Sequence, residues 1–256
     1  MITIKMLKVS TFNILNSCLY YEHRSPLIKR TIDEMDSDIV GLQEIDYNGN
    51  KDICNHPGYK FIYSPAPIPL MWTELGSINL KIDGNGILIK NDIKILAEGY
   101  LTYKSNTRVA QRMKIRVNGR EIWVVNTHLD HITEEERLEQ AMMLIDWLRP
   151  MMNSAIIVMG DFNCVPESET YEFFSRHFKS SMKEVHGKEP DVTWPTEMLG
   201  SRENWERFGE VGCYDYIWFK NLNVVEGRVL THIKDGQFYP SDHYPVQAIF
   251  DLSIPS

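Results

Sequence analysis

Short apolar runs that end at polar residues are the main hydrophobic pattern of this chain. The clearest are residues 39–42 and 155–159, which are bounded by polar residues or glycine. Runs of this length with such boundaries predict buried β-strands. The same patterning predicts strands at residues 8–14, 86–90, 93–101, 108–117, 121–126, 214–219, 224–230 and 246–251.

Helix signals follow some of these strands. Ser25-Pro26 pairs a capping residue with a proline suited to the first helical position, so a helix is predicted to start there. Thr133 opens a capping box before a second helix, which Pro150 ends. A third helix is predicted after Pro166. Many strands, with helices after some of them, predict an α/β (α+β) protein with two packed sheets and helices on their outer faces.

Composition limits the class of protein. The chain has 256 residues, of which 43% are hydrophobic and 24% charged, as in ordinary globular proteins with a sizeable core. No composition break or low-complexity tract divides it, so residues 1–256 are expected to form a single domain. No apolar run is long enough to span a bilayer, residues 1–9 lack the core of a signal peptide, and the four cysteines form no Cys-x-x-Cys pair. We therefore expect a cytoplasmic monomer with no membrane span.

One predicted strand is basic, although the chain as a whole is acidic. The formal net charge of −8 argues against coating duplex nucleic acid through bulk charge. Residues 108–117 alternate, and one face carries Arg108, Arg112, Lys114 and Arg116. Such a face is usually solvated; alternatively, Arg108 or Arg112 reaches a substrate phosphate if that end of the strand meets a site.

Two long loops carry tryptophans. Trp72 lies in residues 65–84, and Trp194 and Trp205 lie in residues 187–212. Long loops in compact domains tend to be functional. These side chains either pack the loops onto the surface or stack on the bases of a single-stranded nucleic acid.

Asp161 and Asn163 follow the strongest predicted strand, residues 155–159. Alternate residues of an extended chain share a face, so both side chains are expected to lie side by side at a rim. A carboxylate and a carboxamide placed together can orient a water molecule and hold a phosphoryl oxygen. The pair therefore suggests a phosphoesterase.

Other predicted strands also end in residues that bind metals or handle protons. Taken singly, each of these residues has a simpler explanation, as a turn residue, a solvated acid or a buried imidazole. Together they are hard to explain by chance. They are Asn13, Glu44, His128, Asp215, Asp242 and His243.

Phosphoester hydrolysis explains these residue types. It needs charge neutralisation at the phosphate oxygens and an activated water. Mg²⁺ takes oxygen ligands, so Glu44 is the predicted metal ligand with Asn13 beside it.

The remaining residues suit proton handling. His128 and His243 are predicted to donate hydrogen bonds to phosphate oxygens, with Asp215 supporting the charge of His243. Asp161 is then predicted to orient or deprotonate the water.

Six motifs carry a family resemblance that runs from Phe12 to His243. In this order they resemble the endonuclease/exonuclease/phosphatase superfamily, whose fold is that of deoxyribonuclease I. They are Thr11-Phe12-Asn13-Ile14, Leu42-Gln43-Glu44, Asn126-Thr127-His128-Leu129, Gly160-Asp161-Phe162-Asn163, Asp215-Tyr216-Ile217 and Ser241-Asp242-His243.

The resemblance implies a four-layer α/β sandwich, with two packed, mostly antiparallel sheets flanked by helices. It implies a Mg²⁺ site, with Mn²⁺ as a substitute, at Asn13 and Glu44, which Asp242 joins. It further implies that Asn163 and His128 hold the phosphate.

The resemblance leaves the substrate open. The wording of the motifs around Asp161 and His243 is similar to the nocturnin and deadenylase branch, whereas residues 126–131 are similar to small metal-dependent hydrolases. The leading hypothesis is a phosphodiester in a nucleic-acid end or a nucleotide. The alternatives are a small phosphoester (a sugar or inositol phosphate, or a lipid headgroup) and a non-catalytic binding protein.

Overall fold

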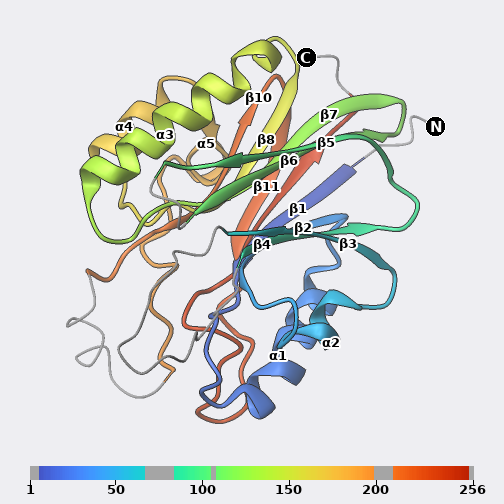
Figure 1. Ribbon diagram of the computed structural model, residues 1–256, viewed down its shortest axis with the longest axis vertical. Coiled ribbons are helices and arrows are strands. Elements are labelled where there is room, and N and C mark those ends of the chain that lie inside the picture. The colour runs from blue at the N-terminus through green and yellow to red at the C-terminus, as the bar shows by residue number, and fades with distance from the viewer. Residues whose placement is uncertain (1–5, 67–83, 105–107, 199–209, 254–256) are drawn as a thin grey trace, which may run out of the picture.

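The computed structural model of the chain describes residues 6–66, 84–104, 108–198 and 210–253. Two six-stranded sheets pack face to face, with α1 and α2 beyond one sheet and α3 and α4 beyond the other (Figure 1). The predicted sandwich of two mostly antiparallel sheets with flanking helices is confirmed. Trp72 and Trp205 lie outside the described residues.

The first sheet has the strand order β11-β12-β1-β2-β4-β3. It consists of β1 (Met6–Asn13), β2 (Ile39–Ile45), β3 (Tyr59–Pro65), β4 (Gly84–Lys90), β11 (Asn223–Val229) and β12 (Val246–Asp251). The second sheet has the order β5-β6-β7-β8-β10-β9. It consists of β5 (Lys94–Thr102), β6 (Val109–Val117), β7 (Arg120–His128), β8 (Ala155–Asp161), β9 (Lys179–Ser180) and β10 (Asp215–Lys220).

Each sheet contains one parallel pair, β1 with β2 and β7 with β8, and its other described pairs are antiparallel. The carboxyl ends of parallel strands meet at the same edge of a sheet. The helical segments are α1 (Tyr21–Met35), α2 (Lys51–Cys54), α3 (Glu134–Leu148), the 3₁₀ turn η1 (Arg149–Met151), α4 (Glu169–Ser175) and α5 (Ser181–His186). No helix in the described part of the chain is long and apolar enough to cross a membrane.

The core has three parts, which follow the layers. Residues such as Val9 and Ile157 fill the space between the sheets, Leu144 and Phe174 pack α3 and α4 on the second sheet, and Ile32 packs α1 on the first. Burial of these side chains is the main favourable term in folding. It fixes how the two sheets meet, and therefore how their ends face each other.

A buried polar contact also joins the sheets. Asn126 of β7 donates from Nδ2 to the carbonyls of Leu42 and Gly86, both at 2.9 Å, and its Oδ1 accepts from Gln43 at 2.6 Å. A Cβ on Gly41 would lie 2.8–2.9 Å from side-chain atoms of Met159 and Asn126, so a larger residue there would displace these side chains. These contacts fix the position of one sheet relative to the other close to the strand ends.

One local prediction needs correction and another is confirmed. The first helix starts at Tyr21, ahead of the predicted Ser25-Pro26 start, and Pro26 lies inside it. Tyr20, in a left-handed conformation, begins the helix, while the Ser25 hydroxyl donates to Asp52. The capping box at Thr133 is confirmed, because its hydroxyl accepts from the amide of Glu136 at 3.2 Å.

Candidate active site

The strand register of the second sheet places three site residues side by side. His128 of β7 pairs with Asp161 of β8, and Asp161 pairs with Asp215 of β10. In the first sheet, Asn13 is the last residue of β1. The neighbouring parallel strand β2 carries Glu44 close to its own carboxyl end. The two sheet edges face each other, so residues far apart in the sequence form one site.

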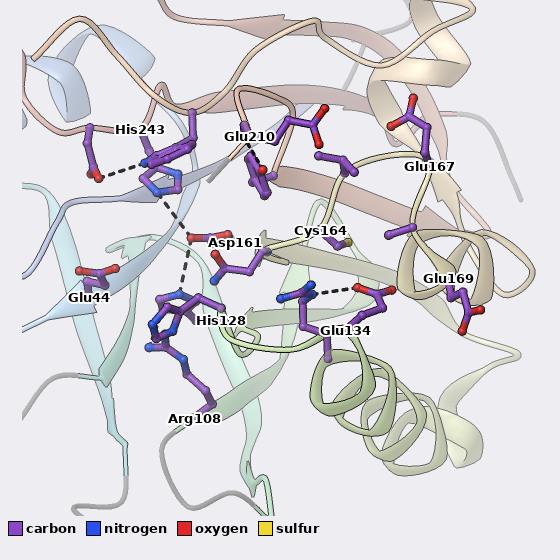
Figure 2. Close-up of a pocket in the computed structure, with 18 residues that line it drawn as sticks. Glu44, Arg108, His128, Glu134, Asp161, Cys164, Glu167, Glu169, Glu210 and His243 are labelled. Carbon is purple, nitrogen blue, oxygen red and sulfur yellow. Dashed lines mark hydrogen bonds and ion pairs between the residues drawn. The ribbon is translucent and has the colours of Figure 1, made fainter. Parts of the chain in front are cut away.

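Asp161 lies at the centre of this site, between His128 and His243 (Figure 2). Its Oδ2 accepts a hydrogen bond from Asn13 Nδ2 at 3.0 Å. The same oxygen lies 3.5 Å from His128 Nε2 and 3.7 Å from His243 Nε2. Burial, with the negative charge of Asp215 adding to it, raises the pKa of Asp161 to about 6. A carboxylate with such a pKa can accept a proton near neutral pH.

His243 forms a buried dyad with Asp215. Its Nδ1 lies 2.9 Å from Oδ2 of Asp215. Burial alone would lower the pKa of His243, but the surrounding carboxylates, Asp215 first and then Asp161, outweigh it and leave the pKa well above its usual value. The dyad thus favours a protonated His243, whose Nε2 faces Asp161.

Glu44 reaches the site through irregular backbone. Its φ is +59°, and the pairing of β2 with β4 shifts between Leu42 and Ile45. Such bulges re-aim a side chain, and left-handed non-glycine residues concentrate at functional sites. The carboxylate accepts from Asn13 Nδ2 at 3.1 Å and from the Asn16 amide at 2.8 Å.

Glu44 and Asp242 fit a divalent cation. Burial, and then the charge of Asp242, raises the pKa of Glu44. Asp242 lines the same cavity, where its Oδ2 accepts from Trp194 Nε1 at 3.1 Å. A buried carboxylate whose pKa is raised by the charge of a neighbouring carboxylate is an arrangement that a hard cation relieves.

A second acidic group lies close by. Among the described residues, Asp161, Asp215 and His243 offer ligand atoms that all lie within 4.8 Å of one another. However, His243 is engaged with Asp215 and carries a proton, and a protonated imidazole is no metal ligand. This group therefore suits proton handling better, and the side with Glu44, Asn13 and Asp242 suits the metal.

Asn163 lines the cavity, but not for the predicted reason. It has a φ of +50°, outside the strand, and its amide donates to Oδ1 of Asp161 at 2.9 Å. Its Nδ2 donates to the Leu129 carbonyl at 3.0 Å, which leaves a second hydrogen on that nitrogen. A tight turn, rather than the alternation of an extended strand, brings it beside Asp161.

The two candidate arginines have different surroundings. Arg108 lines the cavity next to His128. Arg112 does not: it lies 4.0 Å from the ring centre of Trp147 and donates to the Trp147 carbonyl at 2.9 Å. At Arg112 this face of β6 is covered by Trp147 of α3, so the prediction that Arg112 reaches a phosphate is wrong.

The site lies in a cavity of about 830 Å³. Beyond the centre, its wall carries more acidic than basic side chains (Figure 2). Lining residues outside the centre include Glu134, Arg137, Glu167, Glu169, Trp194, Glu210 and Tyr214. Glu134 pairs with Arg137 at 3.0 Å, which neutralises that part of the wall.

Arg24 was missed by the sequence analysis. It is fully buried, and its guanidinium donates to carbonyls of the loop after β1 and of the loop before β12. The acceptors are Ile14 at 2.8 Å, Leu15 at 3.0 Å, Ser17 at 2.7 Å, Leu19 at 3.0 Å and Pro240 at 3.4 Å. Its only sequence signal is its spacing of three, four and seven residues from Leu27, Ile28 and Thr31, which are also buried.

A model of the endonuclease/exonuclease/phosphatase family matches residues 10–243. The chain belongs to this family. Membership places it among hydrolases of phosphoester bonds, as the sequence predicted, and members typically depend on a divalent metal.

Named relatives in the family show how far the likeness goes. Human nocturnin is 27% identical over 271 residues, which cover 93% of this chain and 60% of nocturnin. The Candida albicans Ccr4 subunit, named a 3′-5′-exoribonuclease of the CCR4-Not complex, is 23% identical over 303 residues, which cover 91% of this chain and 38% of Ccr4. The chain thus spans about half the length of the curated relatives it matches.

Solved structures of the family share the fold. The catalytic domain of human nocturnin, solved with a bound sulfate anion, has a TM-score of 0.75 and 26% identity, covering 96% of this chain and 94% of that domain. A mannosyl-6-phosphatase from Bacteroides thetaiotaomicron has a TM-score of 0.77, with 94% of this chain and 98% of that one covered. At 20% identity, the second likeness concerns the fold alone.

Proposed function

We propose that the chain hydrolyses a phosphoester by metal-assisted attack of a water molecule that Asp161 activates. The position of Asp161 is the observation that carries the proposal. Its Oδ2 is held by Asn13 at 3.0 Å and faces His128 and His243 across 3.5 and 3.7 Å. A general base must be oriented and must have a pKa close to the working pH, and burial raises that of Asp161 to about 6.

Mg²⁺ is the proposed cofactor. Glu44, with Asn13 and Asp242 beside it, would hold the ion, which would neutralise charge on the phosphate oxygens. The residues supply oxygen donors, which Mg²⁺ and its substitute Mn²⁺ prefer.

The other site residues bind the phosphate. His128 is neutral, because burial and then the charge of Arg108 hold its pKa well below its usual value, so it donates without adding charge. His243 supplies the positive charge, and Asp215 keeps it protonated. Asn163, which also lines the cavity, offers its remaining amide hydrogen.

A phosphodiester in a nucleic-acid end or a nucleotide is the first substrate candidate. It is supported by two relatives, nocturnin and Ccr4, the second of which is named an exoribonuclease subunit. Within the site, Arg108 and the ring of Trp194 offer a cation and a stacking surface at the cavity.

A small phosphoester is the second candidate, and one observation favours it. The outer cavity wall carries Glu167, Glu169 and Glu210, which repel an extended polyanion. A short substrate that places its phosphate at Asp161 avoids that repulsion.

The proposal is tested with an end-labelled, single-stranded RNA that carries a 3′ adenosine tail, and with bis(4-nitrophenyl) phosphate. Each is incubated with Mg²⁺, with excess chelator, and with Asp161→Asn protein. We expect Mg²⁺-dependent hydrolysis of at least one of them, and a loss of about 10³-fold in Asp161→Asn. Asp146→Asn is the matched control, because Asp146 is exposed on α3 and pairs only with Arg149 among the described residues.

The outcomes divide clearly. A ladder that shortens from the 3′ end supports the nucleic-acid substrate, and intact RNA beside a cleaved diester supports the small one. Hydrolysis that persists in Asp161→Asn or in chelator contradicts the mechanism.

A further inference from the structure

Arg108 joins two histidines at the cavity wall. Its Nη1 lies 3.4 Å from Nδ1 of His128, and its Nη2 lies 3.1 Å from Nδ1 of His131. A guanidinium has donors only, so both Nδ1 atoms must be acceptors. Each imidazole therefore carries its proton on Nε2, and His131, which also lines the cavity, has a free Nε2–H to offer.

Arg108 brings a positive charge that forms no ion pair with a carboxylate within 4.0 Å among the described residues. The comparison is Arg137, the other arginine of the described wall, which pairs with Glu134 at 3.0 Å. The Nε of Arg108 is also buried without a hydrogen-bond partner in the described part of the chain. A guanidinium that lines a cavity, has no carboxylate partner there and keeps an unmet donor suits an anionic ligand.

This charge is displaced from the reacting phosphate. Arg108 contacts the Nδ1 edge of His128, whereas the Nε2 edge of the same ring faces Asp161 (Figure 2). An anion bound by Arg108 and His131 therefore lies on the far side of the His128 ring from the attacked phosphorus. It is a second group, separate from the one that is hydrolysed.

We propose that Arg108 and His131 form a subsite for a second phosphate group of the substrate. The inference rests on the proposed function, because it takes the reacting phosphate to lie at Asp161. Arg108 gives the charge, and His131, held in its Nε2–H tautomer by Arg108, gives a directed hydrogen bond. The substrate is thus a phosphoester that carries a further phosphate, either the next one along a nucleotide chain or a second one on a small molecule.

Two matched substrate pairs distinguish these sources. The first is the 4-nitrophenyl ester of thymidine 5′-phosphate, with and without a 3′-phosphate. The second is glucose 6-phosphate against glucose 1,6-bisphosphate. We expect the second phosphate to raise kcat/KM about tenfold or more in one of the pairs, as one charge-assisted contact allows.

Variants locate the effect. His131→Ala should reduce the ratio of kcat/KM within the preferred pair about tenfold, and Arg108→Gln should abolish the preference. His232→Ala is the matched control, since His232 is exposed and pairs with Glu34 away from the cavity. Calorimetry with Asp161→Asn protein, comparing thymidine 3′,5′-bisphosphate with thymidine 5′-phosphate and glucose 1,6-bisphosphate with glucose 6-phosphate, gives a readout that does not depend on turnover.

Different results would contradict the subsite and the proposed function. Hydrolysis of the single-phosphate esters with no gain from a second phosphate in either pair, and equal affinities within each pair in calorimetry, overturns the subsite and leaves the proposed function standing. An unchanged ratio in His131→Ala also overturns it. Absence of Mg²⁺-dependent hydrolysis of every ester overturns the proposed function itself.

Discussion

The two sheets deliver their site residues in different ways. The second sheet uses regular strand register, which sets His128, Asp161 and Asp215 on neighbouring strands at one level. The first sheet uses irregular backbone: Glu44 sits in a bulge with φ of +59°, and Asp242 lies in a loop. In the proposed mechanism, the regular side would handle protons and the irregular side would offer oxygen ligands to the metal.

This difference shows where the stability of the site comes from. On the second sheet, hydrogen bonds of the ladder position the side chains at little extra cost. On the first, the loops need a separate anchor, which Arg24 provides by bonding carbonyls from both of them. Asn13 connects the halves, because its Nδ2 donates to Glu44 and to Asp161.

The largest effect is expected from removing a charge on the irregular side. Glu44→Gln keeps the shape and its acceptor oxygen but removes the negative charge that would hold Mg²⁺. We expect kcat/KM at low Mg²⁺ to fall about 10²–10³-fold, with part of the loss recovered at high Mg²⁺. Mn²⁺ titration by calorimetry should show the weaker binding directly. Glu34→Gln, at an exposed position, is the control, and equal Mn²⁺ affinity in Glu44→Gln would remove it from the metal site.

Loss of the anchor is expected to act on stability and on the site together. Arg24→Met leaves five carbonyls, those of Ile14 and Pro240 within the buried contacts, without their cation, which should lower the free energy of unfolding by about 2–3 kcal/mol. Arg30→Met, at an exposed site of the same helix, should change it by less than about 0.5 kcal/mol. Thermal unfolding and Mn²⁺ affinity are measured together. Weaker Mn²⁺ binding in Arg24→Met, at a temperature where both proteins are folded, distinguishes an anchor from a packing residue, and unchanged binding would contradict it.

The sequence predicted the regular side well, because its signals are local. Apolar runs locate the strands, and the polar residue that closes a run lies at the end of its strand, as Asp161 does at the end of β8. The order of motifs then predicts the fold by resemblance. Such signals depend only on residues that are neighbours in the sequence, so they can be recognised before the structure is known.

The errors concern features that depend on distant residues. Arg112 follows the same alternation as its neighbours, but whether that face meets solvent or α3 depends on packing with Trp147. Arg24 precedes the predicted helix start and looks like an ordinary surface charge, because only the fold brings the loops near Ile14 and Pro240 onto its guanidinium. Asn163 was predicted from strand periodicity that ends at Asp161.

The smallest expected effect is a pH dependence that belongs to the regular side. Asp161 acts as a base only when ionised, and its pKa is about 6, so kcat/KM should fall as the pH drops through 6 and be about tenfold lower at pH 5. Above pH 7 this carboxyl should impose no further change, because it is already ionised. The measurement is kcat/KM for bis(4-nitrophenyl) phosphate from pH 5 to 9 at saturating Mg²⁺. The residual rate of Asp161→Asn should lack this acid limb, and a limb retained in that variant would assign it to another group and remove Asp161 as the base.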